Sequence, residues 1–322
     1  MFDKIKLREK NHLKTIIGDL GISLALLLEV ILFSILSPHF FTADNILNVT
    51  LQTSITAIIA AGMTFVILTA GIDLSVGAMV AFSGVIVTSI LKLGMPFSLS
   101  FPLGLSAGIL IGICSGSLAS LFVTKFNITP FIVTLALMTI LRGSAYMYTQ
   151  GRPIWGLPEE FSFLGSGRVL GIPVPTIMMI CIYIIAFIVL KYTKFGRYVY
   201  AVGGNKEAAR LAGIHINLVL WSVYIISGVL SALSGVLLAS RMNSGQPNAG
   251  LMYEMDVIAA VVVGGTSLFG GRGSIVGTFL GAMLIGVLRN GLNLLNVGSY
   301  VQMVVLGVVI LLAVLLDQLR IK

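Results

Sequence analysis

Long apolar runs recur along almost the whole chain, from Gly18 to Leu316, and they limit what the chain can fold into. Hydrophobic residues make up 57% of its 322 residues and charged residues only 10%. A soluble domain typically carries roughly 25% charged residues. Because a helix needs about 20 apolar residues to cross the hydrocarbon core of a bilayer, the sequence predicts an all-α, polytopic membrane protein.

The apolar runs predict about ten transmembrane helices, some of them short or broken. No polar stretch between them is long enough to form a soluble core of its own, so residues 1–322 are expected to form a single transmembrane domain. The predicted spans cover residues 18–36, 49–69, 77–93, 101–123, 129–149, 174–190, 217–240, 254–268, 274–290 and 299–316.

The distribution of lysine and arginine predicts the orientation of these spans. An even number of spans places both termini on one side, together with the basic tail 1–17 and the loop 191–216. Most of the 20 basic residues lie on that side, and few lie in or near the loop 150–173 on the other side. Because cytoplasmic loops are enriched in lysine and arginine, we expect both termini and loop 191–216 in the cytoplasm and loop 150–173 outside.

Glycine recurs every fourth residue in two of the predicted spans, which places the glycines on one helix face. These glycines, which predict close helix packing, are Gly104, Gly108, Gly112, Gly116, Gly273, Gly277 and Gly281. In addition, residues 69–77 and 264–273 are two glycine-interrupted polar segments in comparable places of the two halves. They predict either broken helices near the pathway of a duplicated transporter fold or a pair of tight cytoplasmic turns.

The chain carries no sequence signature of an enzyme. It contains neither a phosphate-binding G-x-x-x-x-G-K-[ST] motif nor H-E-x-x-H. Its three histidines lie far apart in the sequence, so no metal site is expected. The basic residues are scattered between apolar runs, which argues against binding of nucleic acid. We therefore expect no catalytic residue and no cofactor in this chain.

Polar residues within the apolar runs are the candidates for a translocation pathway. The charged ones are interpreted as structural ion pairs or helix-end anchors, with only Glu29 placed deep: Glu29, Asp73, Arg142, Glu254, Asp256 and Arg289. Neutral hydrogen-bonding groups suit an uncharged polyol. The pathway candidates chosen on this basis and from the segment 69–77 are Thr69, Asp73, Ser75, Asn290, Asn293 and Gln302.

The loop 191–216 is predicted to contain a short helix that docks on a partner. Asn205 is suited to cap it, Glu207 favours its first turn, and Gly213 is suited to end it. Ala208, Leu211 and Ala212 would then form a small apolar face, which fits a groove on another protein.

Several segments of the chain resemble a known family. The run Glu207-Ala-Ala-x-x-x-Gly213 is similar to the cytoplasmic EAA-type motif of ABC importer permeases. Residues 37–42, 62–77, 196–205, 259–268 and 290–295 resemble the monosaccharide permeases of this class, their ribose-transporting members most closely. The resemblance implies ATPase coupling for Gly196, Arg197, Asn205, Glu207, Ala208, Ala209, Arg210, Leu211 and Gly213.

The resemblance also implies partners and a location. It implies a bacterial inner-membrane protein that works with a second permease copy, a separate ATPase that binds Mg-ATP, and an extracytoplasmic sugar-binding protein. The expected solute is D-ribose, with another pentose, a hexose or a sugar-like signalling molecule as alternatives. A homodimer is favoured over a pair of paralogues. From the residues alone, an ion-coupled secondary sugar carrier without an ATPase, and a membrane enzyme that acts on lipid, remain as other classes.

Overall fold

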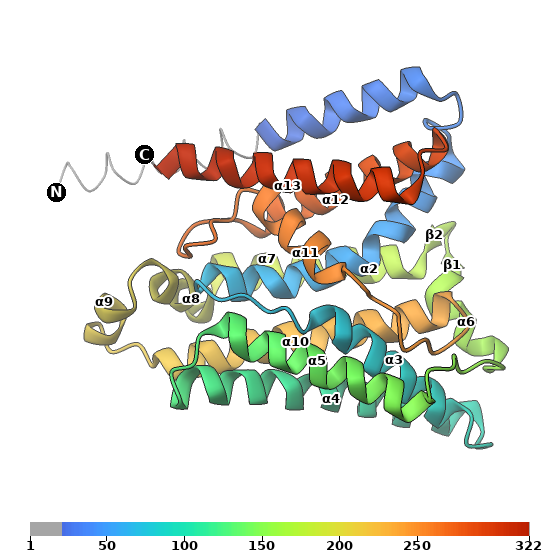
Figure 1. Cartoon of the computed structure of the whole chain (residues 1–322), viewed down its shortest axis with the longest axis horizontal. Helices are drawn as coiled ribbons and strands as arrows, with labels where there is room; N and C mark the ends of the chain where they lie inside the picture. The colour runs from blue at the N-terminus through green and yellow to red at the C-terminus, as the bar shows by residue number, and fades with distance from the viewer. Residues whose placement is uncertain (1–20, 322) are drawn as a thin grey trace.

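The computed structural model describes residues 21–321, which are almost entirely helical (Figure 1). The predicted basic tail, residues 1–17, lies outside the described residues. The first described helix is Gly21–Leu36. It is followed by α2 (Ala43–Leu68), α3 (Val76–Leu91), α4 (Phe97–Lys125), α5 (Pro130–Thr149), α6 (Glu159–Ser166), β1 (Arg168–Val169), β2 (Ile172–Pro173), α7 (Val174–Tyr192), α8 (Lys194–Gly204), α9 (Lys206–Leu211), α10 (Ile216–Arg241), α11 (Tyr253–Val263), α12 (Ile275–Leu294) and α13 (Ser299–Ile321).

Each of the ten predicted spans overlaps one of these helices, but not every helix is long enough to cross a bilayer. Among the described residues, six helices are both long and apolar enough: α2, α4, α5, α7, α10 and α12. The segments Gly21–Leu36, Val76–Leu91 and Ser299–Leu312 are apolar but shorter. Helix α11 has 11 residues, so its length of about 16 Å is half of a hydrocarbon core of about 30 Å. The polytopic membrane protein is confirmed, whereas the predicted span 254–268 is not a full crossing.

Helix α2 forms the centre of the molecule. Nearly all of its residues from Thr53 to Leu68 are buried, because α7, α10, α11 and α12 pack around it. The hydroxyl of Tyr183 on α7 donates to the carbonyl oxygen of Ala57 at 2.9 Å, and the hydroxyls of Thr64 and Thr278 join α2 to α12 at 2.8 Å. The outer helices α4 and α5 instead expose many leucine and isoleucine side chains, as expected for helices that face lipid.

The glycine spacing brings helix backbones close together, as predicted. A methyl group on Gly112 of α4 would overlap the backbone of Gly228 on α10, and one on Gly116 would overlap the carbonyl oxygen of Tyr224. On α12, Gly277 and Gly281 lie in the same way against Gly264 and Ala260 at the end of α11. The predicted close packing is therefore confirmed in both spans.

Two helices begin part-way between the two ends of the molecule, after irregular segments made largely of turns. Residues 69–75 lead into α3, and residues 242–252 lead into α11 (Figure 1). The starts of the two helices meet, since a methyl group on Gly77 would overlap the carbonyl oxygen of Gly250. Helix α5 holds both segments: Thr134 donates to the carbonyl oxygen of Ile72 at 3.3 Å, and Arg142 donates to those of residues 247 and 249 at 2.9 and 2.6 Å.

The two ends of the molecule carry different elements (Figure 1). One end, called here the α9 end, holds α8, α9 and the last turns of α13. The opposite end, the α6 end, holds α6 and the hairpin of β1 and β2, whose turn residues Leu170 and Gly171 have φ of 51° and 82°. The predicted external loop 150–173 is thus partly ordered as a helix and a hairpin, and the predicted coupling loop 191–216 contains two helices rather than one.

Candidate functional site

The short helix predicted in loop 191–216 is present as α9. The Asn205 side chain caps it by accepting a hydrogen bond from the backbone N–H of Ala208 at 3.0 Å. The chain leaves the helix at Gly213, whose φ of 78° is a left-handed conformation that glycine adopts without strain. Sequence reasoning missed α8, which ends at the residue before Asn205. Gly196 lies in its first turn, where its N–H donates to the Thr193 hydroxyl at 3.1 Å, and Arg197 on the same turn is exposed.

Helix α9 presents apolar side chains at the surface. The side chain of Leu211 is 85% exposed, and Ala208 and Ala212 are also exposed, whereas Ala209 is buried against the rest of the protein. Glu207 and Arg210 form an ion pair at 2.8 Å, and both side chains are mostly exposed. Since an exposed ion pair contributes at most about 1 kcal/mol to folding, neither this pair nor Leu211 is needed for the fold.

Helix α8 connects α9 to the two glycine-interrupted segments. The N–H of Gly271 donates to the carbonyl oxygen of Leu68 at 2.9 Å, so the predicted segments 69–77 and 264–273 do approach each other. Gly203 packs directly on this bond, and the hydroxyl of Tyr200 donates to the carbonyl oxygen of Gly273 at 3.0 Å. We call these five residues the α8 junction. Burial raises the pKa of Tyr200, which keeps its hydroxyl protonated as a donor.

Two of the predicted pathway residues, Asp73 and Ser75, form a buried hydrogen-bonded group with Ser227 at the start of α3. One oxygen of Asp73 accepts from the N–H and the hydroxyl of Ser75, at 3.0 and 2.6 Å, and the other accepts from the hydroxyl of Ser227 on α10 at 2.8 Å. Thr69 is buried and donates to the carbonyl oxygen of Val66. The bond between Asp73 and Ser227 fixes the irregular segment 69–75 against α10.

The other three predicted pathway residues lie toward the end of α12 and the start of α13. The amides of Asn290 and Asn45 exchange two hydrogen bonds, at 2.9 and 3.0 Å, which tie α12 to α2. Gln302 donates to the side chain of Asn293 at 2.8 Å, and Asn293 is exposed. The six predicted pathway residues therefore do not form one site. They lie in two regions, and their hydrogen bonds join helices and loops to one another.

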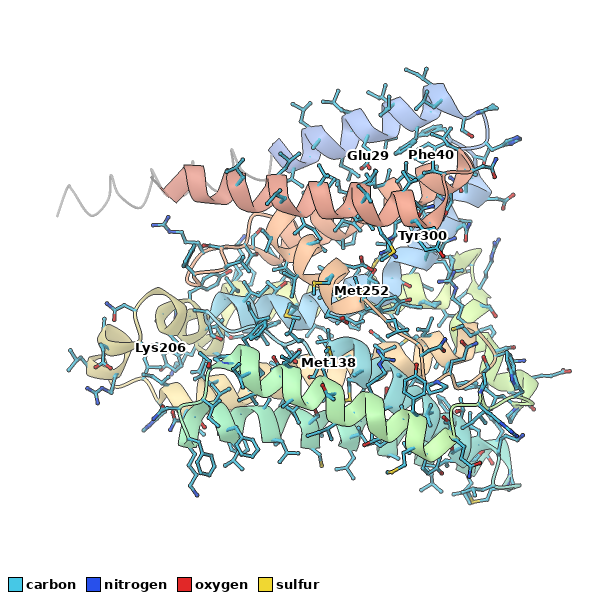
Figure 2. All side chains as sticks on the ribbon, in the orientation of Figure 1. Glu29, Phe40, Met138, Lys206, Met252 and Tyr300 are labelled. Atoms are coloured by element: carbon cyan, nitrogen blue, oxygen red, sulfur yellow. The ribbon has the colours of Figure 1, made fainter. Side chains whose placement is uncertain are left out.

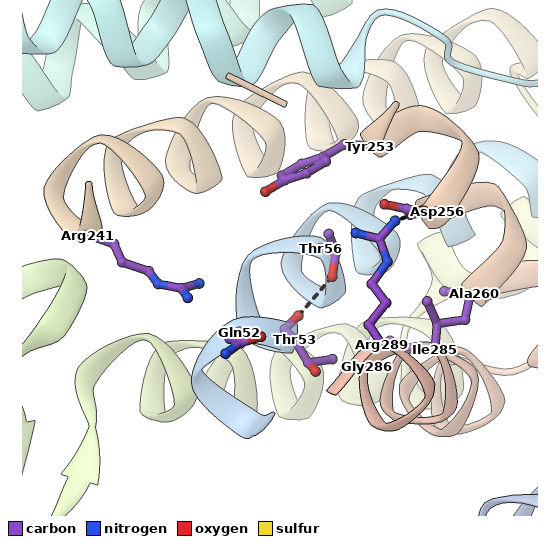
Figure 3. A pocket seen from close by; sticks show the side chains of 11 residues that line it. Gln52, Thr53, Thr56, Arg241, Tyr253, Asp256, Ala260, Ile285, Gly286 and Arg289 are labelled. Carbon is purple, nitrogen blue, oxygen red and sulfur yellow. Dashed lines mark hydrogen bonds and ion pairs between the residues drawn. The ribbon is translucent and has the colours of Figure 1, made fainter. Parts of the chain in front are cut away.

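A polar cavity of about 220 Å³ opens elsewhere, between α2, α10, α11 and α12 (Figure 3). None of the six predicted pathway residues lines it. Its wall is built from residues of these four helices, namely Gln52, Thr53, Thr56, Arg241, Tyr253, Asp256, Ala260, Ala282, Ile285, Gly286 and Arg289.

The cavity wall carries charged groups. Arg289 donates to one oxygen of Asp256 at 2.5 Å, and the side chain of Asp256 is only 8% exposed. The other oxygen of Asp256 and the Nε of Arg289 have no hydrogen-bond partner among the described residues. Figure 3 shows Arg241 extending into the cavity from the end of α10, toward Gln52. Since Gln52 and Thr56 on the same wall can also accept, the wall offers both donors and acceptors to a bound molecule.

Sequence reasoning missed this cavity because it placed Glu254 and Asp256 at the end of a full membrane span. The structure instead starts α11 inside the protein, so Asp256 is buried in its first turn. The signal available in the sequence was that Asp256 and Arg289, an acid and a base, both lie within apolar segments, where they could form a pair. A charge within a membrane is costly unless it is paired or faces water.

Comparisons with known proteins give a consistent result. The family described as branched-chain amino acid transport system / permease component matches residues 45–314. The chain is 49% identical over 298 residues to the ribose import permease protein RbsC of Haemophilus influenzae, covering 91% of each chain. It is 49% identical over 313 residues to the protein of that name from Bacillus subtilis, covering 97% of this chain and 96% of the other.

A more distant similarity also involves a sugar transport protein. The D-allose transport system permease protein AlsC of Escherichia coli is 38% identical over 300 residues, which is 93% of this chain and 91% of the other. No solved structure matches this chain.

Proposed function

This chain belongs to the family of branched-chain amino acid transport system permease components, and we propose on that premise that it is the permease subunit of an ATP-driven ABC importer for D-ribose. The observation that supports ribose, rather than an amino acid, is the 49% identity over nearly the whole chain with ribose import permeases of two bacteria. The similarity to a D-allose permease also favours a monosaccharide.

The proposed energy source is a separate ATPase subunit that binds Mg-ATP beneath the α9 end. The exposed apolar side chains of α9, on a helix that is capped at both ends, support this docking role. The coupling residues are those implied by the family motif: Gly196, Arg197, Asn205, Glu207, Ala208, Ala209, Arg210, Leu211 and Gly213. The permease itself supplies no catalytic residue.

Coupling would pass from α9 to the transmembrane helices through the α8 junction. When the two halves of the ATPase close, a displacement of α9 moves α8, whose Gly203 and Tyr200 contact the end of α2 and the loop before α12. Helices α2 and α12 both line the cavity. A movement at the α8 junction is therefore well placed to open and close the cavity in alternating access.

The proposed orientation follows from the basic residues. The α9 end, which carries basic residues of α8 and α9 such as Lys194, Arg197 and Arg210, lies in the cytoplasm. An even number of apolar segments would place both termini on that side as well. The α6 end faces outward and receives the sugar from an extracytoplasmic binding protein. Ten apolar segments are then embedded in the bilayer, with α11 as a broken one, and two copies of this chain form the complete permease.

Complex assembly and ATP hydrolysis test this function. The chain is co-expressed with its candidate ATPase and purified, and ATP hydrolysis is measured in lipid nanodiscs. We expect co-purification of the ATPase and stimulation of hydrolysis by the ribose-loaded binding protein. Purification of this chain without the ATPase, together with hydrolysis that does not respond to the binding protein, would contradict the proposal.

A further inference from the structure

We propose that the cavity between α2, α10, α11 and α12 is a sugar-binding site within one permease subunit, in which the Asp256–Arg289 pair and Arg241 hydrogen-bond to the hydroxyl groups of the monosaccharide. The inference rests on the proposed function, because it assigns a solute to a cavity in a transport protein. It differs from the pathway residues predicted from the sequence, none of which lines this cavity.

The first support is the size of the cavity. Its volume of about 220 Å³ is below the range of about 300–1,000 Å³ that is typical of sites for drug-sized ligands. At about 30 Å³ for each water molecule, it would hold several waters. A space of this size suits a molecule with the dimensions of a single sugar ring, and it is too small for an oligosaccharide.

The second support is the set of hydrogen-bonding side chains on its wall. Arg241 and Arg289 can donate, and the side chain of Arg289 is 38% exposed although it is paired with Asp256. Gln52 and Thr56 on the same wall can also accept, so a ligand that supplies both a donor and an acceptor is favoured. A sugar hydroxyl does both, and its hydrogen bonds to charged groups are stronger than those to neutral ones.

The third support is the position of these groups on separate helices. Asp256 lies on the short helix α11, Arg289 on α12 and Arg241 at the end of α10, while Gln52 and Thr56 come from α2 (Figure 3). The ring of Tyr253 adds an apolar surface beside the charged groups. A ligand held between these helices would sense any movement of α2 against α12, which is the movement that the α8 junction is placed to drive.

A thiol-protection experiment tests the site. Thr56→Cys is introduced together with Cys114→Ala and Cys181→Ala, which remove the two native thiols, and the full permease with its ATPase is placed in nanodiscs. The rate of alkylation of this thiol by a small water-soluble reagent is measured with and without millimolar D-ribose. We expect ribose to slow alkylation several-fold, and mannitol and leucine to slow it much less.

The same thiol then reports on the charged pair. Asp256→Asn with Arg289→Gln removes both charges at once, so that no unpaired charge is left in the protein. We expect this double variant to abolish the protection and to lower ribose uptake by about tenfold or more. Stimulation of ATP hydrolysis by the binding protein should change less than about twofold, because the change does not touch the α8 junction or α9.

A matched control is available on α2 and α12, two of the four helices that line the cavity. Thr64→Val with Thr278→Val removes another buried polar pair between α2 and α12, outside the cavity. We expect this variant to retain ribose protection and uptake.

Any of three results would overturn the inference. The thiol is not alkylated, ribose gives no protection, or protection persists in the Asp256 and Arg289 double variant. These results leave the proposed function standing if the wild-type complex imports ribose. If the wild-type complex shows no ATP-dependent ribose import, the proposed function fails instead.

Discussion

At the residue scale, the most constrained position of the α8 junction is Gly203. A methyl group there would overlap the carbonyl oxygen of Leu68 and crowd the N–H of Gly271, which are the two atoms of the hydrogen bond that closes the junction. Gly204, the next residue, has no atom within 4 Å of an added methyl group. The two neighbouring glycines therefore give a matched pair of substitutions.

We predict that Gly203→Ala destabilises the protein by about 1–3 kcal/mol, because backbone atoms must move apart. Gly204→Ala should be neutral or stabilising by up to about 1 kcal/mol, since alanine favours a helix over glycine. Thermal unfolding of the purified permease followed by tryptophan fluorescence measures both. Equal melting temperatures for the two variants would contradict the close approach described here.

The carboxylate of Asp73 is the second residue with a sharply defined role. Asp73→Ala would leave the N–H and hydroxyl of Ser75 and the hydroxyl of Ser227 without their acceptor. We predict a loss of about 3 kcal/mol or more in stability, because each buried group left unsatisfied costs about 1–3 kcal/mol. Asp73→Asn keeps one acceptor oxygen and should cost clearly less. Melting temperatures rank the variants, and an Asp73→Ala protein that melts with the wild type would refute this role.

At the element scale, α9 is a capped helix whose exposed apolar side chains are not needed for folding. Its cap and its end were predictable from the sequence, because Asn205 and Gly213 act through their own neighbours. Helix α8 was not predicted, since the run of basic residues and the following glycines resemble a loop. The structure shows that α8 is amphipathic, because Val199 and Val202 are buried against the rest of the protein.

The exposed leucine of α9 gives a prediction at this scale. Leu211→Asp should leave the melting temperature unchanged, because the side chain is 85% exposed. It should weaken ATPase binding by about tenfold or more, since a leucine buried in an interface contributes roughly 1.5–3 kcal/mol. Binding is measured by titrating the labelled permease with the ATPase.

The matched control for this experiment lies at the other end of the molecule. Leu170, in the turn of the hairpin, is 98% exposed. Leu170→Asp makes the same chemical change at a place that the ATPase does not reach, and it should bind the ATPase as the wild type does. A loss of binding in both variants, or in neither, would contradict the docking role of α9.

The broken helices show where sequence reasoning reached its limit. All ten predicted spans coincide with helices, because in lipid every backbone group must be satisfied within a helix. The sequence did not reveal that α11 starts part-way along the molecule or that residues 242–252 form an irregular series of turns before it. These features depend on Arg142, which binds the carbonyl oxygens of residues 247 and 249 from a helix about 100 positions earlier in the chain. Such a long-range contact leaves no local pattern.

At the scale of the whole molecule, two regions are separate. The α9 end carries the exposed helix and the α8 junction, while the polar cavity is formed by α2, α10, α11 and α12. Figure 2 shows Lys206, the first residue of α9, at the α9 end of the molecule, and Met252, which precedes α11, near its middle. Helix α2 links the two regions, because it ends at the α8 junction and lines the cavity with its first half.

The candidate site was less predictable than the fold for the same physical reason. Apolar runs and glycine spacing are local, and they identified the helices and their close packing. The cavity depends on which charged side chains meet, and Asp256 and Arg289 are 33 positions apart in the chain. The short helix α9 could be predicted because its residues are consecutive, whereas the cavity could not because its wall comes from four helices.

On the proposed function, this chain imports ribose only together with an ATPase and a binding protein. The most direct measurement is the uptake of labelled D-ribose into proteoliposomes that contain all three components, with ion gradients collapsed. We expect uptake that requires ATP on the side of the ATPase and that stops when either partner is omitted. Uptake by this chain alone, driven by an imposed proton or sodium gradient, would contradict it.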